Sequence, residues 1–496
     1  MVLIVVALGL FNFFYGELVP VNEGLGWDGA TYARLTVYID YMISTGRLSS
    51  YYAQRILPSL IVRYVLIFSG SEFSTENIIR VFLLYNTLLL AVSCAIWKRI
   101  SDNFSLSPNG RWIGFGGLFL SYGYSKNLFY APVTTDATAL VIGLLLLLFH
   151  VEKRPIALLT TTVIGAFAWP VVSICGALLL FFLRTDLLGA VISPAASPCS
   201  ARSVQFARWV MWAWFGLLGV CITGFAIFHG MAAEFWMGLN VKRLADLLTG
   251  IPSHAGAAIA LLMLVGSLAY FNAAAVRFHK TSFILIGLSI AAVLIPWTVV
   301  RQISNALIPN PNDVGMMREY IFFPPTGKFL LPFVSLAVFW GPLVLLLFLK
   351  WHAFCCEARR LGPGVVAVIG FSLPLGLAND PRYMIAAWPF FVLGGVLALE
   401  SQSGNESRFP VAFVVLTLLY AQFWMKLNLA PWPTGDYEGL ADFPKQMLFM
   451  HHGRWMNWWS YSLQLVGIGL SLLWLRNDLK RRTHHGAVFT EDHSGC

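Results

Sequence analysis

Long apolar runs separated by short polar connections dominate this chain of 496 residues. Apolar residues make up 58% of the sequence, and charged residues make up only 11%. About 20 apolar residues are needed to cross the roughly 30 Å of a bilayer core, and a helix satisfies its own backbone hydrogen bonds there. We therefore predict an all-α integral membrane protein.

The predicted architecture is a polytopic bundle of about 12–14 transmembrane helices, with amphipathic helices along the membrane in the outer loops. The expected spans lie near 2–18, 80–97, 112–126, 133–152, 155–169, 170–184, 208–230, 255–276, 281–300, 329–350, 364–378, 383–400, 410–428 and 459–475. Residues 155–183 form either one tilted helix or a hairpin, and Trp169-Pro170 favours a hairpin turn. The amphipathic helices are expected at 57–68, around Arg63, and at 233–248.

Basic residues gather on one side of the membrane in this threading. They are Lys98, Arg99, Arg111, Lys153, Arg154, Arg184, Arg277, Lys280, Lys350, Arg359, Arg360, Arg476, Lys480, Arg481 and Arg482. Such a bias marks the cytoplasmic side, so both termini are expected there. The net charge of +9 then reflects topology and contact with the lipid bilayer, and gives no indication of a nucleic-acid partner. We expect a bacterial inner (plasma) membrane, with the endoplasmic reticulum membrane as the alternative.

The domain organisation is predicted to be one polytopic membrane domain over 1–482, followed by a disordered cytoplasmic tail over 483–496. The long outer loops are expected at 19–79, 231–254, 301–328 and 429–458, and functional residues should be sought in them. The seven cysteines are scattered, so neither a disulfide framework nor a zinc site is predicted.

Three aspartates that are far apart in the chain fall on the outer side of this threading. Asp28, Asp136 and Asp380 each lie at the mouth of an expected helix or in the loop beside it. Carboxylates gathered at one interface can act as acids or bases, so we predict chemistry on a membrane-bound substrate.

Four short motifs accompany these aspartates. They are Trp27-Asp28-Gly29-x-x-Tyr32, Tyr52-x-x-Arg55-Ile56-Leu57-Pro58, Pro132-x-x-x-Asp136-Ala137 and Asp380-x-Arg382-Tyr383-x-x-x-Ala387-x-Pro389. In this order and on this side, the motifs resemble those of the GT-C superfamily of integral-membrane glycosyltransferases. The resemblance implies that the first outer loop carries the catalytic carboxylate and that a polyprenyl-phosphate-linked sugar is the donor.

Asp28 is the expected catalytic base. Gly26 and Gly29 flank it and allow a bulky substrate to approach, and burial beside Trp27 and Tyr32 would raise the pKa of a carboxyl group. Alternatively, Asp28 caps the helix that follows it. Asp136 is the second catalytic candidate, orienting the acceptor or sharing a divalent metal, Mg²⁺ or Mn²⁺, which the resemblance allows; its alternative is a dipole-favoured place in the first helical turn. The outer face has no Asp-x-Asp motif, and no metal ligand is assigned.

The expected substrate-binding residues are Trp27, Tyr32, Arg55, Asp380, Arg382 and Tyr383. The guanidinium of Arg382 is suited to a phosphate, because it can donate two parallel hydrogen bonds. Its alternative is a local ion pair with Asp380. Arg55 competes with Arg382 as the phosphate ligand, against snorkelling or a structural contact.

The predicted function is transfer of a sugar from a polyprenyl-phosphate donor to a glycan, lipid or protein acceptor on the outer face, with inversion at the anomeric carbon. One alternative is a polymerase or ligase that moves lipid-linked glycans and depends on outer arginines. Another is a secondary transporter or flippase, for which charged residues in the middle of helices would be expected.

Overall fold

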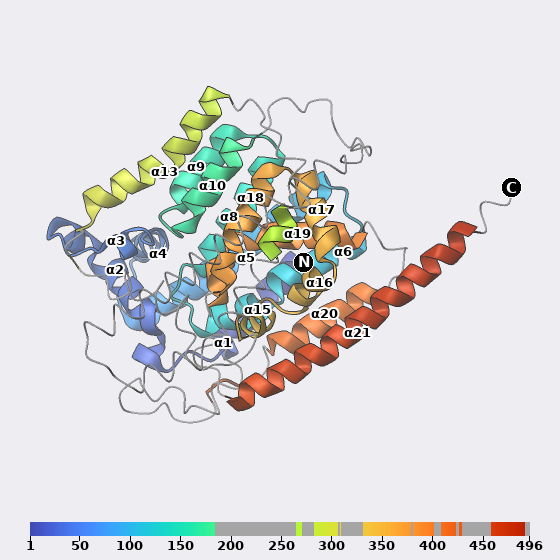
Figure 1. Ribbon diagram of the computed structural model, residues 1–496. Helices are drawn as coiled ribbons and strands as arrows, with labels where there is room; N and C mark the ends of the chain where they lie inside the picture. The colour runs from blue at the N-terminus through green and yellow to red at the C-terminus, as the bar shows by residue number, and fades with distance from the viewer. Residues whose placement is uncertain are drawn as a thin grey trace, which may run out of the picture.

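The computed structural model describes residues 1–183, 264–269, 282–305, 308, 331–377, 380–400, 408–422, 426–428 and 458–491. Every regular element within these ranges is a helix, which confirms the predicted all-α class (Figure 1). The helices expected at 208–230 and 233–248, and most of the one at 255–276, lie outside the described residues. So does most of the outer loops at 231–254, 301–328 and 429–458.

The first part of the chain forms a compact series of helices. They are α1 (Val2–Tyr15), η1 (Val21–Gly24), α2 (Trp27–Ser44), α3 (Ser50–Ala53), α4 (Leu57–Ser69), α5 (Thr75–Asn103), α6 (Pro108–Phe119), the π-helical η2 (Gly123–Asn127), α7 (Leu128–Tyr130), α8 (Asp136–Val151), α9 (Pro155–Gly165) and α10 (Val171–Phe181). The amphipathic run at 57–68 is thus the helix α4. The Trp169-Pro170 turn separates α9 from α10, which confirms the hairpin.

The second part contributes a further set of helices. They are α13 (Phe283–Ile303), α15 (Leu331–Trp340), α16 (Pro342–Leu349), α17 (Trp351–Leu361), α18 (Pro363–Ser372), η3 (Pro374–Leu377), η4 (Pro381–Met384), α19 (Trp388–Glu400), α20 (Arg408–Ala421) and α21 (Trp458–Glu491). Two predictions differ from the structure here. The span expected at 329–350 is two helices, because the chain turns at Gly341 before Pro342 begins α16. Helix α21 continues to Glu491, so residues 483–491 are helical and not the disordered tail that was predicted.

Local chemistry explains where several helices begin. Ser74 accepts a hydrogen bond from the backbone N–H of Asn77 at the start of α5, and Ser107 accepts one from Gly110 at the start of α6. These serines satisfy backbone donors that have no partner within the helix. Pro58, Pro108 and Pro363 stand in the first turn of α4, α6 and α18, where the missing N–H costs no hydrogen bond.

Within the described ranges, α5 and α13 are the two helices that are long and apolar enough to cross a membrane by length and composition. Shorter apolar helices, of 10–17 residues, include α1, α4, α8, α9 and α10. These lengths are below the roughly 20 residues of a straight span, because turns and breaks divide the apolar runs.

The helices form one packed body around α5, α8 and α19 (Figure 1). At one side, α13 packs against the α9–α10 hairpin and contacts α3, beside α2 and α4. At the other side, α21 packs against α15 and α16 and lies alongside α20 (Figure 1), where the Tyr420 hydroxyl is 3.1 Å from that of Ser471.

Stacked aromatic rings occupy the centre of the body. The rings of Trp340 and Trp388 stack with centroids 4.5 Å apart, and the Trp388 indole N–H donates to the Gly117 carbonyl at 2.9 Å. Phe354 and Phe391 stack in the same region. This arrangement joins α6, α15, α17 and α19 and buries a polar indole group with its hydrogen bond satisfied.

A carboxylate joins the N-terminal segment to the far end of the chain. Glu17 Oε2 accepts hydrogen bonds from the backbone N–H groups of Leu427 and Asn428, each at 2.9 Å. The Asn428 side chain donates to the Leu18 carbonyl and accepts from the Tyr130 hydroxyl. Residues 426–428 are therefore fastened to the segment that leads into α2.

Close helix packing generates a prediction at Gly143 of α8. A Cβ placed at Gly143 would lie 2.3 Å from the carbonyl oxygen of Ala386, a backbone atom that cannot rotate away. We expect Gly143→Ala to lower the free energy of unfolding by about 1–3 kcal/mol, as overpacking does. The unfolding midpoint of the purified protein in detergent measures this change. The matched control is Gly287→Ala in α13, where no atom lies within 4 Å, and an unchanged midpoint for Gly143→Ala would contradict the packing.

Candidate functional site

Two predicted catalytic aspartates are brought to the same region by the packing of α2 on the segment before α8. Asp28 is the second residue of α2, and Asp136 is the first residue of α8. A Cβ at Gly29 would lie 2.9 Å from the Val133 carbonyl oxygen, so only a glycine permits this close approach. Asn86 of α5 holds the same segment by donating to the Pro132 carbonyl at 2.9 Å.

Charged groups from four separate parts of the chain interact around Asp136. The buried Asp136 carboxylate interacts electrostatically with Arg382, Asp380, Asp28 and Arg55. With Tyr51, Trp169 and Tyr383, which adjoin them, these residues are called the polar cluster below. The structure thus gathers both predicted catalytic residues and the two predicted phosphate ligands.

The two catalytic candidates interact with their charged neighbours only at longer range in the described part of the chain. Among the described residues, the side chains of Asp28 and Asp136 make no hydrogen bond and no ion pair. The N-cap of α2 is Gly26, and no side chain caps that helix end. The alternative of Asp28 as a capping residue is therefore wrong, whereas Asp136 does occupy a first helical turn. Two carboxylates are available to a ligand.

Arg55 is a nearly buried cation supported by aromatic rings. Arg55 is 7% exposed. Its guanidinium carbon lies 3.7 Å from the ring centre of Tyr51 and 5.5 Å from that of Trp169. One guanidinium nitrogen, Nη1, donates to the Tyr51 carbonyl at 3.1 Å. Within the described part of the chain no carboxylate lies within ion-pairing distance of Arg55. Its remaining N–H donors can therefore bind an anion.

Tyr51 supplies a neutral hydroxyl beside this cation. Burial raises the pKa of Tyr51 to about 12, against a smaller opposite effect from Arg55. The phenol is consequently protonated at physiological pH and can donate a hydrogen bond. Its electrostatic interactions with Asp28 and Arg382 place it within the polar cluster.

Arg382 is already occupied by Asp380. The Arg382 side chain donates through Nε to both Asp380 oxygens at 3.0 Å and through Nη2 to Oδ2 at 2.7 Å, and its backbone N–H donates to Oδ1 at 3.1 Å. Burial opposes the charge of Arg382, but Asp380 and Asp136 outweigh it and raise the pKa of the guanidinium. The local ion pair foreseen as an alternative is present, so Arg55 has more free donors for a phosphate.

The predicted aromatic residues have different surroundings. Tyr383 lies with its ring centre 6.5 Å from that of Trp169, inside the polar cluster. Tyr32 is buried beneath Tyr52, edge to face at 5.8 Å. Trp27 packs instead against a separate apolar cluster that includes Tyr130 and Leu427.

Tyr51 and Trp169 were not predicted as site residues. Tyr51 stands four residues before Arg55, a spacing that places two side chains on one helical face and that points to Tyr51 in retrospect. Trp169 was recognised only as part of a hairpin turn. Its approach to Arg55 depends on how the α9–α10 turn meets the start of α4, where the Leu57 N–H donates to the Phe167 carbonyl, and no local pattern indicates this contact.

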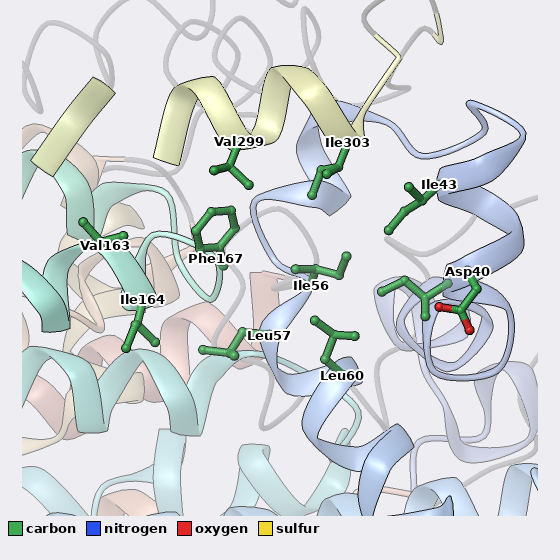
Figure 2. Close-up of a pocket in the computed structure, with 11 residues that line it drawn as sticks. Asp40, Ile43, Ile56, Leu57, Leu60, Val163, Ile164, Phe167, Val299 and Ile303 are labelled. Carbon is green, nitrogen blue, oxygen red and sulfur yellow. The ribbon is translucent and has the colours of Figure 1, made fainter. Parts of the chain in front are cut away.

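An apolar groove lies between α2, α4, α9 and α13 (Figure 2). It has a volume of about 350 Å³ and is lined by Ile39, Asp40, Ile43, Ile56, Leu57, Leu60, Val163, Ile164, Phe167, Val299 and Ile303. Figure 2 shows these side chains surrounding a common space between α2, α4, α9 and α13. Asp40 is the one charged residue in this lining.

The groove and the polar cluster share the same two stretches of chain. Arg55 of the cluster is followed directly by Ile56 and Leu57 of the groove. Phe167 lines the groove two residues before Trp169, and its carbonyl accepts a hydrogen bond from the Leu57 N–H at 2.9 Å. An elongated ligand with an anionic head and an apolar chain could therefore contact both parts.

The described ranges contain no candidate metal site. No three histidine, cysteine or carboxylate side chains there gather closely enough to hold a metal ion. We therefore assign no metal ligand.

Comparison with protein-family models, with curated proteins and with solved structures found no match for this chain. The candidate site is consequently defined by its own geometry: two carboxylates that make no hydrogen bond or ion pair with any other described residue, an arginine packed against aromatic rings, and an adjoining apolar groove.

The Asp380–Arg382 pair generates a stability prediction. The Asp380 side chain is only 5% exposed, so Arg382→Gln would remove the charge of the guanidinium that pairs with a buried carboxylate. We expect a loss of about 3 kcal/mol in the free energy of unfolding, at the lower end for a broken buried pair because Arg382 itself is 28% exposed. Thermal unfolding in detergent measures it. Arg80→Gln, which breaks the exposed Arg80–Glu76 pair, is the matched control, and equal midpoints for the two variants would contradict the assignment.

Proposed function

We propose that the protein is a membrane glycosyltransferase that transfers a sugar from a polyprenyl-phosphate donor to an acceptor on the outer face of a bacterial inner membrane. The observation that carries the proposal is the junction of the polar cluster with the apolar groove at Arg55 and Ile56. The order of the four motifs along the sequence, which resembles that of the GT-C superfamily, gives the reaction class.

A polytopic membrane location is supported by the large apolar side chains on the outside of the body. On α13, Phe283 is 91% exposed and Trp297 is 55% exposed, and on α21 Val466 and Leu470 are 61% and 63% exposed. Contiguous apolar surface of this kind is unfavourable in water and favourable against lipid tails. The basic residues of the expected cytoplasmic loops support the orientation.

The groove and Arg55 support a lipid-linked donor. In this proposal the isoprenoid chain lies in the apolar groove, and the phosphate accepts hydrogen bonds from Arg55 and from the Tyr51 hydroxyl. Tyr51 and Trp169 hold the guanidinium in place through their ring faces, which reduces the entropy lost when it binds the phosphate. Arg382 acts by neutralising Asp380 and by its electrostatic interaction with Asp136.

The roles that we propose for Asp28 and Asp136 rest on the absence of hydrogen bonds and ion pairs from their side chains among the described residues. Asp28 accepts the proton of the acceptor hydroxyl while that oxygen bonds to the anomeric carbon of the sugar. The bond from this carbon to the phosphate oxygen breaks on the opposite face, and the phosphate leaves with the electron pair, so the configuration inverts. Asp136 accepts a hydrogen bond from the acceptor or from the sugar and thereby orients the reacting groups.

The catalytic role of Asp28 is tested by Asp28→Asn. Sugar transfer from a panel of polyprenyl-phosphate sugars to membrane acceptors is measured with the purified wild type and with the variant. We expect a loss of about 10²-fold or more, the scale of a general base, because asparagine cannot accept the proton. Asp102→Asn, in an exposed ion pair on the opposite side of the expected topology, is the matched control.

Two outcomes of this assay would contradict the proposal. Full activity of Asp28→Asn would move the base to Asp136 or favour the polymerase or ligase alternative. Absence of transfer by the wild type from every donor would remove the glycosyltransferase and favour the transporter or flippase alternative.

The phosphate-binding role of Arg55 gives a separate prediction. Arg55→Gln removes the charge but keeps a planar side chain, so donor binding should weaken about tenfold or more while the maximal rate changes less. Steady-state kinetics against donor concentration measures KM and kcat separately, with Arg80→Gln as the control. A fall in kcat at unchanged KM would show that Arg55 does not bind the ground-state phosphate.

A further inference from the structure

The wall of the groove formed by α2 contains a break in the helix. Tyr38 has φ −119° and ψ 20°, outside the helical region, within a helix that is otherwise continuous from Trp27 to Ser44. Residues before the break include Asp28, and three residues after it, Ile39, Asp40 and Ile43, line the groove. The direction of the groove wall therefore depends on how this break is held.

One guanidinium bridges the break. Arg63 of α4 donates through Nη1 to the carbonyl oxygens of Thr36 and Val37, at 2.9 and 2.7 Å, on the near side of Tyr38. Through Nη2 it donates to Asp40 Oδ2 at 2.6 Å on the far side. A side chain that satisfies carbonyls freed at a kink is a recognised cause of helix bending. The Arg63 side chain is 17% exposed, whereas that of Asp40 is 80% exposed, so the carbonyl bonds are the better protected ones.

The same helix that supplies Arg63 forms the facing wall. Ile56, Leu60 and Arg63 follow one another at spacings of four and three residues and therefore share one side of α4. Leu60 and Ile56 line the groove, and Arg63 reaches across to α2. Ser59 adds a second link before the break, donating to the Tyr32 carbonyl at 3.0 Å. The part of α2 after the break lines the groove. Among the described residues, Arg63 makes the hydrogen bond that connects α4 to this part of α2.

We propose that Arg63 is a specificity-determining residue that sets the width of the groove and thereby selects the branched isoprenoid chain of the donor. This inference rests on the proposed function, because it takes the donor chain as the occupant of the groove. Isoleucine and valine side chains on α2, α9 and α13, together with Ile56 at the start of α4, form much of the groove wall. Such side chains are stiff, so a small change in the separation of the walls alters the fit of methyl branches. Loss of Arg63 would free the second half of α2 to move relative to α4.

The test compares two ligands that share a phosphate head. Farnesyl phosphate and dodecyl phosphate have the same main-chain length and differ in methyl branches and double bonds. Their dissociation constants are measured on the purified full chain in lipid nanodiscs by native mass spectrometry. Because the head is the same, the contribution of Arg55 cancels from the ratio, which reports chain recognition alone.

We expect the wild type to bind farnesyl phosphate at least about tenfold more tightly than dodecyl phosphate, a difference of about 1.4 kcal/mol. Arg63→Leu replaces the guanidinium by an apolar side chain and removes all three hydrogen bonds, and should bring the ratio close to one. Arg63→Lys, whose single ammonium cannot span both sides of the break, should give an intermediate ratio and serves if the leucine variant does not fold. Arg80→Leu, at an exposed site on α5, should keep the wild-type ratio.

The outcomes separate this inference from the proposed function. A wild-type ratio near one, or an unchanged ratio in both Arg63 variants, overturns the role of Arg63 while leaving the donor class intact. Equal weakening of both ligands reduces Arg63 to a structural residue and also overturns it. If the wild type binds neither ligand, the polyprenyl-phosphate donor and the role of Arg63 fall together.

Discussion

The candidate site is organised around Arg55, a buried cation whose direct contacts are with uncharged groups. Burying an arginine costs free energy unless other groups replace its hydration. At Arg55 the replacement comes from two ring faces and one carbonyl, while the nearest carboxylates act only at longer range. The two rings come from α3 and from the α9–α10 turn, which meet at Arg55. The next residue along the chain, Ile56, already lines the groove.

Hydrophobicity predicted much of the fold. Apolar runs located α5, α8, α13 and α19, and Trp169-Pro170 marked the turn between α9 and α10, because proline cannot continue a helix. The break between α15 and α16 and the continuation of α21 were not predicted. In the first case the run stays apolar across Gly341, so hydrophobicity alone gives no sign of a turn. In the second, residues 483–496 were predicted to be disordered, although a helix that has already formed can extend into such a segment.

The candidate site divides in a similar way. Asp28, Arg55, Asp136 and Arg382 carried local signals in short motifs, and the structure brings them together. What each of them does there depends on contacts between distant segments. The sequence offered Arg382 as the first choice for a phosphate because it stands at a helix mouth, yet its neighbour Asp380 takes up its donors. Trp169 and Arg63 gain their significance only from tertiary packing, since their partners Arg55 and Thr36 come from other elements.

The hydrogen bonds from Leu427 and Asn428 to Glu17 limit how early in synthesis this part of the structure can form. The two partners are separated by 410 positions in sequence. At a synthesis rate of about 5–20 residues per second, the Glu17 carboxylate waits roughly 20–80 s after its own addition before these two amides exist. During that interval the segment leading into α2 lacks its final attachment, although α2, α4 and α8 have already been made. The time at which this attachment forms is therefore set by the length of the chain and not by the speed of helix formation.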